Sequence, residues 1–271
     1  MLLADDGTPG IAYQAVIGDA EGKRAEIRWA VASNPNPTGA QDWTVTVAAS
    51  HDVPDLDDGE LGPPDLANEP GIFVTAALKA DGTPWIAYYD RPTGALRSVQ
   101  WTDGAFTQPA RLDGGGAEDV GWYPSAWIDG EDVAHVAYVD AQNDDLLFLS
   151  MGSTPELVDD GYREDGMTSD GLPRPVFHMV GDDSSVLMSG GTTVVVYQDA
   201  TTHELLMGER AEDGTWSHTA LAGAESPFAG AYGFYASAEL AGTDAWIATT
   251  VYDPPSYSQW VEVFVESLGI E

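Results

Sequence analysis

Apolar residues in this chain recur as short clusters rather than at helical spacing. Four clusters combine aliphatic residues with Tyr and end in Asp, at 86–90, 136–140, 195–199 and 249–253. A fifth cluster, at 11–15, keeps the apolar part and lacks the Asp. A short apolar run bounded by polar residues is typical of a buried strand. The clusters therefore predict five copies of one strand.

A second pattern precedes most of these clusters and reads Gly-x-x-x-Ser/Thr-Ala. It begins at Gly71, Gly121 and Gly233, and a weaker copy begins at Gly181. Two patterns that recur in the same order indicate internal repeats. We place these repeats at about residues 1–50, 71–113, 121–160, 181–222 and 233–269.

Each repeat contains signals for four short strands. The first strand ends in a turn such as Asp81-Gly82, and the second is the apolar cluster. The third begins at Leu96, Leu146 and Leu205 and, less regularly, at Ile27 and Trp260; 106–112 and 215–221 are examples of the fourth. The 30 Gly and 17 Pro would interrupt helices. We predict a single all-β domain over residues 1–271, a β-propeller of about five four-stranded blades, either complete or part of a larger propeller.

Two turn phrases resemble those of bacterial β-propeller repeats of the sialidase-like or Asp-box kind. They are Asp-Gly-Thr-Pro-Trp-Ile-Ala-Tyr-Tyr-Asp at 81–90 and Glu-Asp-Gly-Thr-Trp at 212–216. The second lacks the leading Ser of an Asp-box and has one residue fewer before Trp. The resemblance spans nearly the whole chain and implies a fold, because such propellers include sialidases, lectins and proteins without an activity. Residues 3–9 align with 78–84, so we expect a piece of a larger polypeptide that begins and ends inside blades.

Charge narrows the range of partners. With 45 acidic and 10 basic residues, the chain has a formal net charge of −35, which disfavours nucleic acid and anionic membranes. The absence of Cys excludes disulfides and thiolate chemistry. No apolar stretch is long enough for a membrane-spanning helix. We expect a secreted or surface-attached bacterial protein.

Candidate binding residues come from the repeats and from one acidic segment. Asp90, Asp140, Asp199 and Asp253 end the four clusters, where they either bind a cation or basic ligand or accept hydrogen bonds from their own turns. Trp85 and Trp122 are candidate platforms for a sugar ring, with core packing as the alternative. Asp55, Asp57, Asp58 and Glu60 are spaced closely enough to bind Ca²⁺, or form a solvated acidic loop. A looser acidic group contains Asp159, Asp160, Asp165 and Asp170.

No residue pattern identifies a catalytic site. The eight Arg match no triad of the kind with which a sialidase binds a substrate carboxylate, and carboxylates are too numerous for one pair to stand out. The sequence therefore favours a non-catalytic recognition or scaffold domain without enzyme activity, binding carbohydrate, cations or a protein partner through an acidic face. The alternative is a glycoside hydrolase or lyase with carboxylates at the mouth of the axial channel. A third hypothesis is a spacer without a small ligand.

Overall fold

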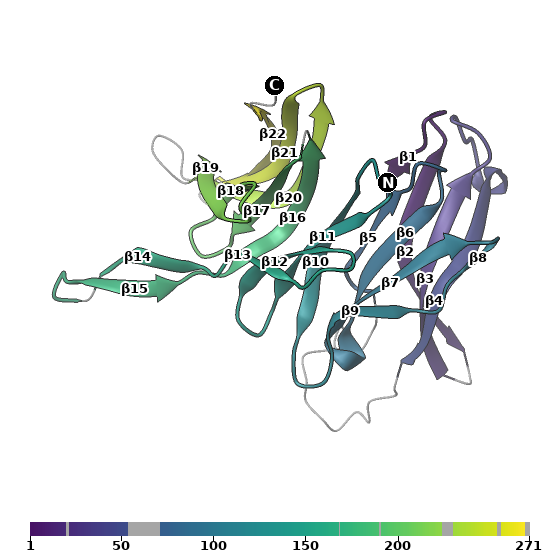
Figure 1. Ribbon diagram of the computed structural model, residues 1–271, viewed down its shortest axis with the longest axis horizontal. Helices are drawn as coiled ribbons and strands as arrows, with labels where there is room; N and C mark the ends of the chain where they lie inside the picture. Colours follow the sequence, from purple (N-terminus) through teal and green to yellow (C-terminus); the bar gives the residue numbers. More distant parts are fainter. Residues whose placement is uncertain are drawn as a thin grey trace. The chain divides into compact units, whose positions relative to one another are not determined.

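A computed structural model describes residues 1–19, 22–53, 71–167, 169–189, 191–223, 230–253 and 256–268. The chain divides into two compact units, Met1–Ala134 and His135–Glu271. Both are built from antiparallel strands (Figure 1), and the described helical residues form only two short 3₁₀ turns, Ala40–Asp42 and Arg91–Thr93. The predicted all-β fold class, with four-stranded sheets of β-propeller type, is confirmed.

The first unit contains two sheets whose strands follow one another in sequence order. The first sheet comprises β1 (Leu2–Leu3), β2 (Pro9–Asp19), β3 (Gly22–Ala32) and β4 (Trp43–Val53). The second comprises β5 (Val74–Leu78), β6 (Pro84–Asp90), β7 (Ala95–Thr102) and β8 (Ala105–Phe106), with β9 (Ala110–Gly114) also paired to β7. The strand β10 (Val120–Ile128) then packs against β5 and β6.

The second unit repeats this order. Strands β11 (Ala134–Asp140), β12 (Asp145–Ser150) and β13 (Glu156–Asp159) pair in sequence. A four-stranded sheet comprises β16 (Val180–Ser189), β17 (Thr192–Asp199), β18 (Glu204–Arg210) and β19 (Trp216–Ala222). A three-stranded sheet comprises β20 (Ala231–Ala241), β21 (Asp244–Asp253) and β22 (Ser258–Ser267).

One element lies outside the predicted repeat. The strands β14 (Tyr162–Met167) and β15 (Pro173–Phe177) pair only with each other and form a hairpin between β13 and β16. Figure 1 shows this hairpin extending away from the sheet β16–β19. The sequence predicts an acidic loop here, because its apolar residues are too few and too irregular to indicate strands.

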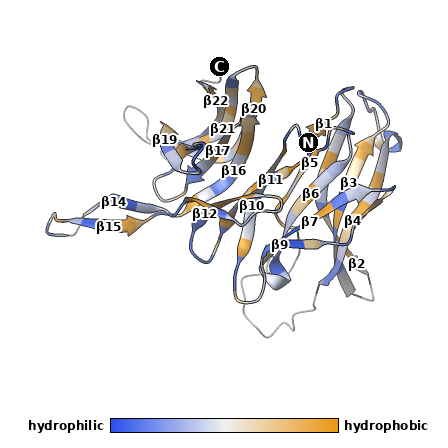
Figure 2. Cartoon of the chain, viewed as in Figure 1, coloured by the Kyte–Doolittle hydropathy of each residue, from blue (hydrophilic) through white to orange (hydrophobic). Residues whose placement is uncertain are grey.

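The apolar clusters form the second strands of the sheets, and those in β6, β11 and β17 are covered on both faces. Every residue of β6 is buried, and so is all of β17 after its first residue. A strand covered on both faces is apolar throughout rather than alternating, which explains the clusters (Figure 2). Their Tyr residues link neighbouring sheets: the Tyr88 hydroxyl lies 3.2 Å from His51 Nε2 of β4, and the Tyr197 hydroxyl donates to Asp159 Oδ2 of β13 at 2.7 Å.

The Ser/Thr-Ala end of the second pattern connects the first strands of adjacent sheets. In the first unit, the Ala126 amide donates to Thr75 Oγ1 at 3.1 Å. In the second unit, the Ala238 amide donates to Ser185 Oγ at 3.0 Å. Thr75 and Ser185 therefore each satisfy an amide of the following repeat, which accounts for the Ser or Thr at these two positions.

The Gly that opens this pattern has both a conformational and a steric role. Gly233 adopts φ +89°, and a Cβ at this position would lie 2.7 Å from Gln198 Cβ and 3.1 Å from Gln198 Cα. Gly121 and Gly181 have φ values of 108° and 100° and face strands of the preceding repeat in the same way. The register of the first strand shifts at Gly181 and at Gly233, as in a β-bulge, where the strand lies close to its neighbour.

Gly233→Ala is expected to lower the free energy of unfolding by about 2–5 kcal/mol, because left-handed strain adds to overpacking against Gln198. Gly242→Ala is the matched control, since Gly242 has φ +71° with no atom within 4 Å of the added Cβ. Gly242→Ala introduces the backbone strain alone and should lower the free energy of unfolding by about 1–2 kcal/mol. Urea denaturation measures both variants, and equal losses would contradict the steric role of Gly233.

Candidate functional site

The second unit brings several Asp residues together where β11 turns into β12, where β13 ends and where β16 begins. We define the carboxylate cluster as Asp144, Asp145, Asp182 and Asp183. The Val180 amide donates to the Asp144 carbonyl at 3.3 Å, which joins the β11–β12 turn to the start of β16. Charges of Asp140, Asp159 and Asp160 also act on the cluster. A dense group of like charges disfavours the ionised form of its members.

Two members of the cluster hold their protons at mildly acidic pH. Burial, followed by the charges of Asp183 and Asp144, raises the pKa of Asp182 to about 6. Burial and the charges of Asp140, Asp160, Asp144 and Asp159 likewise raise the pKa of Asp145 to about 6. A carboxyl group with a pKa near 6 exchanges protons in the range where general acids operate.

Asp183 differs from Asp182 in its hydrogen bonding. It adopts φ +50°, and its Oδ2 accepts a hydrogen bond from the Tyr235 amide at 2.8 Å. Burial raises the pKa of Asp183, whereas the Tyr235 amide acts in the opposite direction and favours the carboxylate. The Tyr235 side chain is 76% exposed. The residue whose amide binds Asp183 therefore also presents an aromatic ring to solvent.

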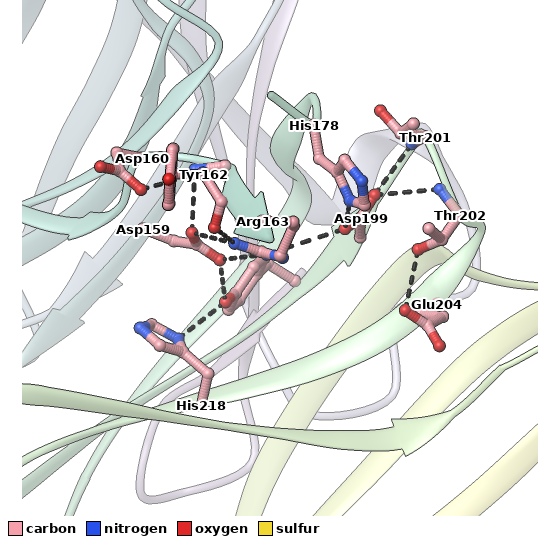
Figure 3. A network of polar contacts seen from close by, with 12 residues as sticks. Asp159, Asp160, Tyr162, Arg163, His178, Asp199, Thr201, Thr202, Glu204 and His218 are labelled. Carbon is pink, nitrogen blue, oxygen red and sulfur yellow. Dashed lines mark hydrogen bonds and ion pairs between the residues drawn. The ribbon is translucent and has the colours of Figure 1, made fainter. Parts of the chain in front are cut away.

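A second group of polar side chains lies at the base of the β14–β15 hairpin (Figure 3). Arg163 donates from both terminal nitrogens to Asp159, at 2.9 Å and 2.8 Å. Asp159 also accepts from the Gly161 amide at 2.9 Å and from the Tyr197 hydroxyl at 2.7 Å. Burial acts to raise the pKa of Asp159, but the hydrogen bonds from Arg163, Tyr197 and Gly161 outweigh it and lower the pKa. Asp159 is a buried, ionised anchor for the hairpin.

Asp199 extends this network to His178, the residue that follows the second strand of the hairpin. Its Oδ2 lies 2.6 Å from His178 Nδ1 and 3.7 Å from the Arg163 guanidinium. Its Oδ1 accepts from the amides of Thr201 and Thr202, both at 3.0 Å. The start of β14 is therefore held by the carboxylate of Asp159 in β13, and the end of β15 by the carboxylate of Asp199 in β17, as Figure 3 shows.

The structure places the other predicted Asp residues in equivalent turns after the second strands. Asp90 accepts from Thr93 Oγ1 at 2.7 Å and pairs with Arg97. Asp140 accepts from the Gln142 amide at 3.0 Å, and Asp253 accepts from Ser256 Oγ at 2.5 Å. All four Asp, including Asp199, thus accept hydrogen bonds from their own turns, the alternative stated for them above. Asp90 belongs to the first unit and the other three to the second.

The predicted aromatic and metal-binding residues lie elsewhere. Trp85 is 3% exposed in the core of the first unit. Trp122 is half-buried, packs on Phe73 and Tyr89, and donates from Nε1 to Asp119 at 3.1 Å. Asp55, Asp57, Asp58 and Glu60 lie outside the described residues, so Ca²⁺ binding there stays a prediction. Among the described residues, no group of three or more His, Asp or Glu is arranged to hold a metal ion.

Sequence reasoning missed Asp182, Asp183 and Asp145 as site residues. A signal for the first two is present in the repeat alignment. Tyr123 and Tyr235 occupy the position equivalent to Asp183, with φ values of 47° and 51°. An Asp pair that replaces aromatic residues in one copy of a repeat marks that copy as chemically different.

Comparisons with known proteins concern the fold. No protein-family model and no curated protein sequence matches the chain. Among solved structures, the α-L-arabinofuranosidase of Lactobacillus brevis matches with a TM-score of 0.48 and 12% identity, over 94% of this chain and 91% of that one. The exo-β-1,3-galactanase of Phanerochaete chrysosporium matches with a TM-score of 0.47 and 8% identity, over 93% and 59%. A puromycin hydrolase matches with a TM-score of 0.47 and 16% identity, over 100% and 37%.

These matches correct the expectation of a non-catalytic recognition or scaffold domain without enzyme activity. The similar structures are hydrolases, and glycoside hydrolases recur among them. The alternative hypothesis, a glycoside hydrolase, agrees with them better, although a likeness at this level assigns no activity to this chain. The sequence could not show that burial raises the pKa of Asp182 to about 6. The resemblance to β-propellers is supported, whereas its sialidase-like detail is not.

No helix in the described part of the chain has the length and apolar character that a membrane span requires.

Proposed function

We propose that the carboxylate cluster of the second unit hydrolyses glycosidic bonds. The observation that carries this proposal is Asp182, a half-buried carboxyl group with a pKa raised to about 6 beside a second carboxylate, Asp183. Acid–base cleavage of a glycoside requires one carboxyl group that donates a proton and a second that accepts one. Tyr235, whose amide donates to Asp183, has an exposed aromatic side chain that a sugar ring could contact.

In this proposal, Asp182 donates its proton to the glycosidic oxygen as the bond between this oxygen and the anomeric carbon breaks. Asp183, which the Tyr235 amide favours as a carboxylate, takes a proton from the water that attacks the anomeric carbon. The products are the two shortened sugars, and one proton returns to solvent from Asp183 while Asp182 is reprotonated. Polysaccharides accumulate outside cells, so we place the activity in an extracellular or cell-surface protein.

The pH profile of the reaction tests this assignment. Release of reducing sugar is measured from soluble neutral polysaccharides and from p-nitrophenyl glycosides. Because Asp182 donates only while protonated, kcat/KM should fall as the pH rises through about 6, by about tenfold for each further pH unit. No hydrolysis of any substrate, or a rate that is flat between about pH 5 and 7, would refute the proposal.

A further inference from the structure

The β14–β15 hairpin exposes apolar side chains that the mechanism above does not use. Phe177 is 72% exposed, Met167 69%, Leu172 63% and Tyr162 41%. Figure 2 shows the hydrophobic end of β15, which lies at the base of the hairpin. Large apolar side chains gathered on one projecting element mark a binding surface more often than isolated exposed residues do.

Two of these side chains form a fixed aromatic platform. Tyr162 and Phe177 are directly opposite each other in the hairpin, and their ring centroids lie 5.6 Å apart in an edge-to-face arrangement. The residues next to them anchor the backbone. Arg163 pairs with Asp159, and the His178 amide donates to the Gly161 carbonyl at 2.8 Å. A binding surface held by buried polar contacts loses little freedom when a ligand binds.

The platform is close to the carboxylate cluster along the chain. Phe177 is five residues before Asp182, a distance that an extended chain spans in at most about 18 Å. On the other strand, the Tyr162 amide donates to Asp160 at 2.9 Å, and the charge of Asp160 contributes to the raised pKa of Asp145. A ligand longer than one sugar ring could therefore contact the platform and the cluster at the same time.

We propose that Tyr162 and Phe177 form an accessory sugar-binding platform and that the substrate is a neutral polysaccharide. This inference rests on the proposed hydrolase function and specifies its substrate class. Aromatic faces stack on the C–H faces of sugar rings and require no charge on the ligand. The net charge of −35 and the Asp residues around the platform repel polyuronates, which leaves neutral chains as the favoured ligand.

The test compares a long and a short substrate. Phe177→Ala and Tyr162→Ala should each lower kcat/KM about tenfold on the soluble neutral polysaccharide that is cleaved best, through KM. On the p-nitrophenyl glycoside of the same sugar, which is too short to reach the platform, both variants should have the same kcat/KM as the wild-type chain. Phe177→Tyr should retain the polysaccharide activity. Tyr257→Ala is the matched control, because Tyr257 is 82% exposed in the same unit but outside the hairpin.

Affinity electrophoresis in native gels separates failure of this inference from failure of the proposed function. The gels contain arabinan, arabinoxylan or β-1,3-galactan, with polygalacturonate as the acidic comparison. Retardation that depends on Phe177, in a chain that hydrolyses nothing, would support the platform and refute the hydrolase. Hydrolysis of polysaccharide that is unchanged in Phe177→Ala would overturn the platform alone. Self-association that depends on Phe177, without retardation, would show that a second copy binds the hairpin and would also overturn it.

Discussion

Asp182→Asn is expected to reduce glycoside hydrolysis by about 10²- to 10⁴-fold, the usual contribution of a positioned general acid. The amide keeps the shape of the side chain and carries no transferable proton. Loss of the proton donor should appear in kcat on polysaccharide and p-nitrophenyl substrates alike. The fall in rate above pH 6 should also disappear from the residual activity, because in this proposal it comes from loss of the Asp182 proton.

Stability distinguishes loss of the acid from loss of the fold. The folded-state pKa of Asp182 lies above its ordinary value, so ionisation of Asp182 at neutral pH destabilises the native state. An uncharged Asn removes this penalty, and the variant should melt at or above the wild-type temperature at pH 7. Below about pH 4, where Asp182 is protonated in both states, the advantage should vanish. A variant that loses activity and stability together would contradict the catalytic role.

Asp213→Asn is the matched control for this experiment. Asp213 lies in an exposed turn of the same unit, where it accepts from the Thr215 hydroxyl at 2.6 Å and from the Thr215 amide at 3.0 Å. These hydrogen bonds lower its pKa, so Asp213 is ionised wherever Asp182 titrates. Its replacement should leave the pH profile of hydrolysis unchanged.

The features that could be predicted from the sequence are local. The turn at Asp81-Gly82 is specified by neighbours: Asp81 Oδ1 accepts from the Thr83 amide at 2.9 Å, and Asp6 makes the same bond to Thr8. The apolar second strands could also be predicted, because burial on both faces leaves a continuous signal in one strand. Strand order followed from the repeat.

The raised pKa values at the candidate site could not be predicted, because they arise between distant segments. Nothing near Asp182 in the sequence indicates that Asp144 contributes to its raised pKa. Likewise, Asp159 and Asp199 are 40 positions apart, and only the fold places Arg163 between them. The hairpin was missed for a related reason, since its exposed apolar residues lack the alternation of a half-buried strand.

Arg163→Met is expected to destabilise the chain by about 3 kcal/mol, because it leaves the carboxylate of Asp159 buried without a cation. We place the loss at the lower end of the usual range for a broken buried pair, since the Arg163 side chain is 25% exposed and water can partly replace it. Tyr197 and Gly161 still donate to Asp159, but neither carries a charge. Urea denaturation at pH 7 measures the loss.

Lowering the pH should reduce the difference in the free energy of unfolding between the wild-type and Arg163→Met chains. The native pKa of Asp159 lies below its ordinary value, so its contribution is complete above the unfolded-state pKa, near 4, and is lost as the pH falls through the native value. In the variant, protonation removes the unpaired charge. The two chains should therefore approach each other in stability below about pH 4.

The pair between Arg210 and Glu156 supplies the matched control. Its Nε–Oε2 distance is 2.7 Å, similar to the Arg163 pair, but the Glu156 side chain is 32% exposed compared with 3% for Asp159. Because water solvates the Glu156 carboxylate after its partner is removed, Arg210→Met should cost less than about 1 kcal/mol. Adding Asp159→Asn to Arg163→Met should recover part of the loss, since position 159 no longer holds a buried carboxylate without a cation. If the two Arg variants lost the same stability, the anchoring role of the buried Asp159 carboxylate would have to be abandoned.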